Sequence, residues 1–135
     1  MATAKGRFAV RVEPLSPNDE SEGVTFGRMS IDKSWQGDFK GTSTGEMLTA
    51  GTNVAGRMSA GYVAIERVRG TLAGRTGSFV FQHSATMDRG AQELSIWVVP
   101  DTGTGDLKGI AGTLSIEIAD GEHYYTLDYS LPVAE

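Results

Sequence analysis

Glycine is the feature of this sequence that most restricts its fold. The chain contains 18 Gly in 135 residues, about twice the usual share of ~7%, and they are spread along its whole length. Each Gly in a helix interior costs about 1 kcal/mol relative to Ala, so long helices have little room here. Gly dispersed among Val, Ile, Thr and Tyr is typical of bent strands and tight turns. We therefore expect an all-β protein.

Short runs of alternating apolar and polar residues indicate where the strands lie. The clearest run is 110–119, in which Leu114 and Ile116 alternate with Ser115 and Glu117. Turn-forming pairs such as Asp-Gly separate the runs. Eight stretches are predicted as strands on this basis: 7–15, 24–36, 40–50, 58–72, 77–88, 92–99, 110–119 and 123–131.

Three stretches between these runs are predicted to be connections. Residues 16–23 are too charged and turn-prone to pair with a strand. Residues 51–57 are expected to link two strands, and 101–108 to form a turn-rich segment with one short helical turn.

Close strand spacing and short turns favour an antiparallel meander within a single domain, 1–135. We expect it to close into an eight-stranded antiparallel barrel, because closure removes the edge strands that a Gly-rich sheet protects poorly. A β-sandwich is the alternative. No linker interrupts the chain.

Charge and composition exclude several classes of partner. The formal net charge is −5, which argues against binding nucleic acid or an anionic membrane surface. Without Cys and with only two His, the chain offers no disulfide and no dedicated zinc site, so we expect neither metal nor cofactor. Apolar runs are too short for a membrane-spanning helix, and residues 1–6 lack the apolar segment of a signal peptide. A cytoplasmic protein is expected.

Two ionisable residues on neighbouring predicted strands are the main candidates for a site. His83 is in phase with Phe79 and Phe81, so it is expected to point inward, as a general base, a ligand-orienting group or a core His with one hydrogen bond. Glu66 is in phase with Tyr62. If it points inward it needs a partner, and His83 is the natural one; the alternative is a salt bridge to an Arg at the rim.

Four further residues are candidates to line the interior. Glu46 either joins the same interior or is a solvated strand residue. The aromatic side chains of Tyr62, Trp35 and Tyr125 either line a pocket or belong to the core.

Four stretches also carry a family resemblance: GEML at 45–48, GYVAIERV at 61–68, GSFVFQHS at 77–84 and VPDTGTGDL at 99–107. They are similar to segments of a bacterial family, the domain of unknown function 3224, over nearly the full chain. That resemblance implies a barrel of the allene oxide cyclase type. Residues 103–112 are also similar to a Gly-Thr-Gly-x-Phe-x-x-Ala-x-Gly pattern of allene oxide cyclases and plant dirigent proteins, with Leu107 in place of the aromatic residue and Ala111 one place off. The pattern implies a turn before a barrel strand and carries no catalytic residue.

Three functions are compatible with these observations. The first is binding of a small, mainly apolar ligand in the barrel interior. The second, implied by the fold relatives, is a cyclase or isomerase in which Glu66 or His83 moves a proton. The third is a structural or interaction protein that forms a homo-oligomer through apolar side chains on its outer face.

Overall fold

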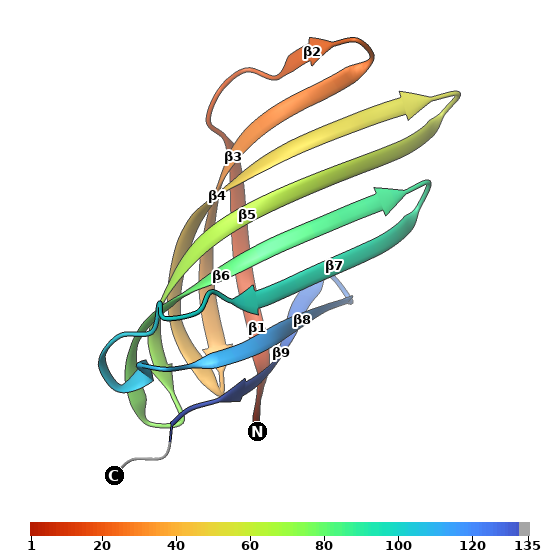
Figure 1. Cartoon of the computed structure of the whole chain (residues 1–135). Coiled ribbons are helices and arrows are strands. Elements are labelled where there is room, and N and C mark those ends of the chain that lie inside the picture. The colour runs from red at the N-terminus through yellow and green to blue at the C-terminus, as the bar shows by residue number, and fades with distance from the viewer. Residues whose placement is uncertain (133–135) are drawn as a thin grey trace.

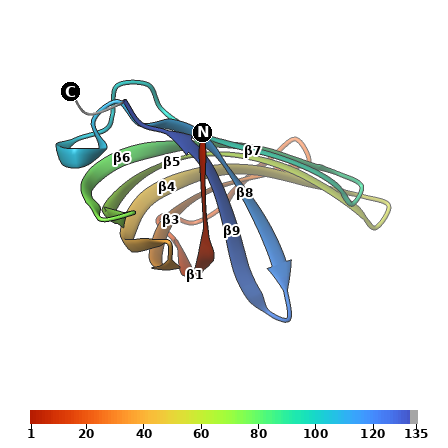
Figure 2. The same cartoon turned by 90° about the horizontal axis from the view of Figure 1, so that it is seen from below.

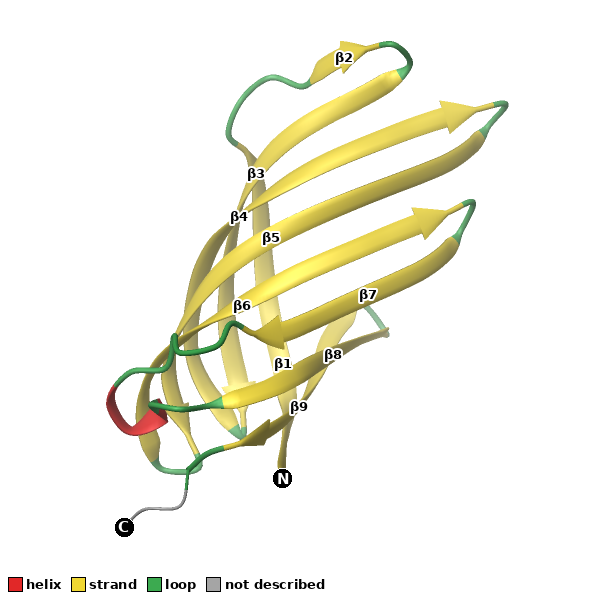
Figure 3. Cartoon of the chain, viewed as in Figure 1, coloured by secondary structure: helices red, strands yellow, loops and turns green. Residues whose placement is uncertain are grey.

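A computed structural model describes residues 1–132 and shows an antiparallel β-barrel (Figures 1 and 3). Nine strands are present in the described chain: β1 (Ala2–Pro14), β2 (Asp19–Ser21), β3 (Val24–Gly37), β4 (Phe39–Val54), β5 (Arg57–Leu72), β6 (Arg75–Asp88), β7 (Ala91–Val98), β8 (Ala111–Ala119) and β9 (Glu122–Ser130). One 3-10 helix, η1 (Gly105–Leu107), lies between β7 and β8.

The barrel is a closed meander of eight strands. Each of β3 to β8 pairs with the next strand along the chain, and β1 pairs with both β3 and β9 to complete the ring. The prediction of an eight-stranded antiparallel closed barrel is therefore confirmed, as is the single helical turn within 101–108.

Two predicted connections are wrong. Residues 16–23 contain the three-residue strand β2, which pairs with the start of β3. Residues 51–57 do not form a linker, because β4 continues to Val54 and β5 begins at Arg57 after a two-residue turn. Each error has a local cause. β2 buries no side chain, so its sequence shows no alternation of apolar and polar residues. Ala55 adopts a positive φ of 54°, which is uncommon for Ala, so the sequence does not indicate a tight turn at this position.

Two-residue turns ending in Gly join most of the long strands. Both turn residues have positive φ, as in the type I′ turns whose twist matches that of a hairpin. These turns are Glu22–Gly23, Ala55–Gly56, Ala73–Gly74, Arg89–Gly90 and Asp120–Gly121.

One end of the barrel is narrow and filled with side chains. The ring of Phe79 packs edge-on against Phe81 at 5.1 Å between centroids, and Trp35 packs edge-on against Phe39 at 5.8 Å. The η1 residue Leu107, which is fully buried, belongs to the same core. The N-terminus and the C-terminal end of β9 also lie at this end of the barrel (Figure 1).

Glycine allows the strands to approach closely at the narrow end. Gly41 of β4 is paired with Gly70 of β5. A Cβ atom on Gly41 would lie 2.0 Å from the Arg69 carbonyl oxygen, and one on Gly70 would lie 2.1 Å from the Lys40 carbonyl oxygen. No side chain fits at either position, so these Gly are required by the close backbone contact rather than by φ.

The other end of the barrel is wide and splits along one line. The ladder between β7 and β8 consists of two residue pairs, Ile96 with Leu114 and Trp97 with Thr113. Beyond them the β8–β9 hairpin diverges from the β6–β7 hairpin (Figure 2). On the opposite side, β9 pairs with β1 as far as Phe8. We call the line between β7 and β8 the seam.

Candidate functional site

The wide half of the barrel contains a cavity of about 420 Å³. The inner faces of β1 and β3 to β6 form one wall, and β7 together with the β8–β9 hairpin forms the other. Much of the lining is aliphatic, with contributions from Val10, Ile31, Met47, Leu94, Ile116 and Ile118. Pockets of this size and polarity hold small organic molecules in many proteins.

Four buried polar side chains lie where the cavity meets the packed core. Lys33 of β3, Ser43 of β4, Glu66 of β5 and His83 of β6 come from four adjacent strands, and we call them the Glu66 cluster. Their inward direction follows from strand alternation: each is in phase with buried apolar residues of its own strand. Lys33 and His83 line the cavity, whereas Glu66 is 0% exposed and lies beneath them.

Glu66 accepts hydrogen bonds from the three other members of the cluster. Its Oε1 atom lies 2.7 Å from His83 Nε2 and 3.1 Å from Lys33 Nζ. Its Oε2 atom accepts from the Ser43 hydroxyl, whose oxygen in turn accepts from Trp35 Nε1 at 3.0 Å. Within residues 1–132 no buried side-chain nitrogen or oxygen lacks a partner, so the cluster is a complete polar network.

The environment keeps Glu66 ionised. Burial is the largest single influence and would raise the pKa of the Glu66 carboxyl. The hydrogen bond from His83, the charge of Lys33 and the Ser43 hydroxyl together outweigh it, so the pKa lies below the ordinary value of 4.5.

Burial lowers the pKa of the Lys33 ammonium, and the Glu66 carboxylate offsets only part of this effect. The Lys33 ammonium also faces the rings of Phe8 and Trp35, at 4.7 and 5.2 Å from their centroids, which favours its charged form.

The position of Glu66 determines which nitrogen of His83 carries the proton. An ionised carboxylate can only accept, so Nε2 donates to Glu66, and neutral His83 then has an unprotonated Nδ1. No other described residue hydrogen-bonds to the His83 imidazole, and no buried side-chain nitrogen or oxygen in the described chain is unpaired. Nδ1 is therefore accessible from the cavity that His83 lines. A carboxylate that orients an imidazole, with the second nitrogen directed at a cavity, is an arrangement suited to accepting a proton or a hydrogen bond.

Three of the six residues that the sequence singled out lie at the cavity or directly beneath it. Glu66 and His83 form the interior pair, and not the rim salt bridge that was the alternative for Glu66. Tyr62 lines the same cavity, and burial together with the Glu66 charge raises its pKa.

The other three predicted residues do not line the cavity, although Trp35 contacts the Glu66 cluster through its hydrogen bond to Ser43. Trp35 and Tyr125 are buried in the core, and the Tyr125 hydroxyl bonds to the backbone of Gln36 and Phe39 at the narrow end. An interior position for Glu46 is wrong: its side chain is 57% exposed and pairs with Arg28 at 2.7 Å. Glu46 is therefore a solvated strand residue, which was the alternative prediction. It lies on the face of β4 opposite to Ser43 and Met47, which point inward.

Sequence reasoning missed Lys33 and Ser43. A signal existed for Lys33, since it is in phase between Ile31 and Trp35, both of which are buried. Ser43 lies in a stretch of Thr, Ser and Gly where alternation of polarity is absent, so only the strand register reveals its inward direction.

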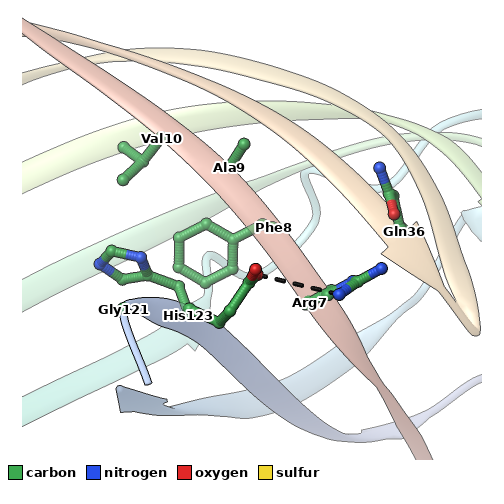
Figure 4. Close-up of a pocket in the computed structure, with 8 residues that line it drawn as sticks. Arg7, Phe8, Ala9, Val10, Gln36, Gly121 and His123 are labelled. Atoms are coloured by element: carbon green, nitrogen blue, oxygen red, sulfur yellow. Dashed lines mark ion pairs between the residues drawn. The ribbon is translucent and has the colours of Figure 1, made fainter. Parts of the chain in front are cut away.

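A second depression lies where β1 and β9 separate (Figure 4). It is about 480 Å³ and open, and Arg7 of β1 and Glu122 of β9 face each other across it at 3.9 Å. The rings of Phe8 and His123, 5.2 Å apart, line both this depression and the cavity. Because its remaining lining is largely solvated, we regard the cavity above the Glu66 cluster as the candidate site.

Comparison with known proteins identifies the family. A family model described as a protein of unknown function (DUF3224) matches residues 4–129. The chain belongs to this family. The DUF3224 fold is also found in a 1.84 Å crystal structure of a protein of unknown function from this family, from Shewanella oneidensis MR-1. That protein is 42% identical, with a TM-score of 0.90 over 98% of this chain and 99% of the other. Comparison with curated proteins gives no match.

Two further properties of this DUF3224 protein concern metals and membranes. Among residues 1–132 no group of three His, Cys, Asp or Glu side chains is placed to hold a metal ion. In the same part of the chain no helix is long and apolar enough to span a bilayer.

Proposed function

We propose that this DUF3224 protein binds a small, mainly apolar molecule in the cavity at the wide end of the barrel. The observation that carries the proposal is the combination of aliphatic walls with a few buried polar groups at one end. Apolar walls supply affinity because the apolar surfaces of the ligand and of the walls are removed from water on binding, and a small number of fixed polar groups orient the ligand.

The cavity lining also exposes apolar side chains that a ligand would cover. Val12 and Leu94 are each 41% exposed and Ile118 is 67% exposed, and all three line the cavity. Removing apolar surface from water contributes roughly 25 cal/mol per Å², so an apolar molecule gains by occupying this space.

A neutral fluorescent probe tests the proposal directly. N-phenyl-1-naphthylamine fluoresces strongly only in an apolar environment. We expect its fluorescence to rise on addition of the wild-type protein. In Ala85→Phe the added ring fills the cavity, so the rise should be lost. Ser84→Phe is the matched control, because Ser84 is the exposed neighbour of Ala85 and its added ring points away from the cavity.

Two results would contradict the proposal. One is no fluorescence change with folded wild-type protein. The other is equal binding by Ala85→Phe and Ser84→Phe, which would place the probe outside the cavity. Native mass spectrometry of protein purified from its own host then identifies any retained ligand by mass.

Acid–base catalysis of the cyclase or isomerase type is the second candidate function. It is favoured by one observation, the accessible Nδ1 of a His83 that Glu66 orients. Catalysis also requires a substrate proton within hydrogen-bond reach of Nδ1, whereas binding does not. Incubating the released natural ligand with fresh protein distinguishes the two: an unchanged ligand supports binding, and conversion that His83→Gln abolishes supports catalysis.

A further inference from the structure

The two charges of the buried Lys33–Glu66 pair balance each other. The Lys33 ammonium is paired with the Glu66 carboxylate at 3.1 Å, and both side chains are at most 5% exposed. Three other titratable groups line the cavity: Tyr62, His123 and the exposed Glu93. None of them supplies a spare positive charge when His123 is neutral. A charged ligand group placed at the Glu66 cluster would therefore lose its hydration without gaining a counter-charge.

The cluster presents one acceptor and one donor group to the cavity. In neutral His83, Nδ1 is an acceptor, because Nε2 carries the hydrogen that is donated to Glu66. Lys33 lines the cavity and has three N–H groups, of which one bonds to Glu66 within the described chain. A ligand group that pairs with His83 must therefore donate a hydrogen to Nδ1. An uncharged hydroxyl group supplies that hydrogen.

Given the proposed binding function, we propose that the cavity selects an apolar molecule that ends in an uncharged hydroxyl group, with this hydroxyl donating to His83 Nδ1. A carboxylate lacks the hydrogen that His83 needs and adds a negative charge. An ammonium supplies the hydrogen but is repelled by Lys33. An ether has no hydrogen to donate and leaves His83 Nδ1 without a donor.

A series of probes with the same chain length separates these head groups. Displacement of N-phenyl-1-naphthylamine is measured at pH 7.5 with 1-octanol, octanoate, octylammonium and heptyl methyl ether. We expect 1-octanol to displace the probe at the lowest concentration. The two ions should bind at least tenfold more weakly, and the ether roughly fivefold more weakly, as expected for one neutral hydrogen bond.

His83→Gln tests the residue itself. The Gln amide nitrogen takes the place of Nε2 and keeps donating to Glu66, while the acceptor at Nδ1 is lost. The variant should bind 1-octanol roughly fivefold more weakly and no longer distinguish it from the ether. Its melting temperature shows whether it is folded, and the comparison of probes on wild-type protein does not depend on it.

The outcomes keep the two proposals apart. If N-phenyl-1-naphthylamine binds in the cavity but octanoate, octylammonium or the ether displaces it as well as 1-octanol does, the head-group inference is wrong and the binding function stands. If 1-octanol binds best and His83→Gln leaves its advantage over the ether unchanged, the placement at His83 is wrong. If the fluorescent probe fails to bind wild-type protein, both proposals fail.

Discussion

Replacing Glu66 by Gln isolates the charge at the centre of the buried cluster. Gln has the same shape, and its amide can still accept from His83 and Lys33 and donate to Ser43, so the hydrogen bonds survive. What disappears is the negative charge 3.1 Å from the Lys33 ammonium. Lys33 is then a buried cation without a counter-charge, which is the most unfavourable way to break a buried ion pair.

The size of the effect follows from two routes that agree. At an effective dielectric constant of about 20, two unit charges at this separation attract by about 5 kcal/mol. Lys33 can instead lose its proton, and doing so at pH 7 from an ordinary pKa of 10.5 costs about 5 kcal/mol. We therefore expect Glu66→Gln to lower the free energy of unfolding by about 3–5 kcal/mol at pH 7.

The second route also predicts the pH dependence. Because burial lowers the folded-state pKa of Lys33, a charged Lys33 penalises folding, and this penalty falls as the pH rises toward 10.5. Neutralising Lys33 costs about 2 kcal/mol at pH 9. The stability difference between wild type and Glu66→Gln should therefore be clearly smaller at pH 9 than at pH 7.

Urea unfolding followed by fluorescence of the buried Trp35 measures both quantities. Glu46→Gln is the matched control, since it removes a carboxylate that is even closer to its partner, 2.7 Å from Arg28, but exposed. That change should cost less than about 1 kcal/mol. The reasoning is refuted if Glu66→Gln costs no more than Glu46→Gln, or if its cost is the same at pH 7 and pH 9.

Two further predictions concern packing and the polar network. Gly41→Ala places a Cβ 2.0 Å from a backbone oxygen, so we expect the free energy of unfolding in urea to fall by about 3 kcal/mol or more. Gly51→Ala on the same strand is the control, because its Cβ would have no neighbour closer than 3.8 Å, and it should change this free energy by less than about 1 kcal/mol. Equal effects of the two variants would contradict the close contact. Ser43→Ala leaves Trp35 Nε1 and one Glu66 oxygen without their hydrogen-bond partner, so it should lower the free energy of unfolding by about 1–3 kcal/mol. The control Ser34→Ala removes an exposed hydroxyl and should lower it by about 0.5 kcal/mol or less. If Ser43→Ala does not change stability, the network tolerates the loss of the Ser43 hydroxyl.

The strands were predictable because barrel strands alternate. Where apolar and polar residues alternate, as in β6 and β8, the predicted ranges agree with the structure within two residues. Where they do not alternate, prediction failed. β2 has only exposed residues, and the end of β4 is a mixture of half-buried and exposed positions. In such segments pairing with the neighbouring strand determines the extended conformation, so the local sequence does not predict it.

The candidate site was predictable only in part, for a related reason. His83 and Glu66 were found because a polar residue in phase with apolar neighbours is conspicuous. Lys33 is also in phase, but a Lys that follows Asp32 resembles an ordinary solvated strand position. Its burial becomes apparent only when closure of the barrel brings β3 within reach of Glu66 on β5, two strands away.

The seam between β7 and β8 gives this barrel something that a fully paired barrel lacks, namely two strand edges. Beyond the two shared pairs, residues 91–95 of β7 and 115–119 of β8 have no partner across the seam in the described chain. Such edges invite another chain to pair with them. Each edge carries an exposed carboxylate, Glu93 on β7 and Glu117 on β8, so two copies that approach edge to edge bring like charges together. These two surface glutamates therefore oppose edge-to-edge pairing of two copies, although they contribute nothing to the core.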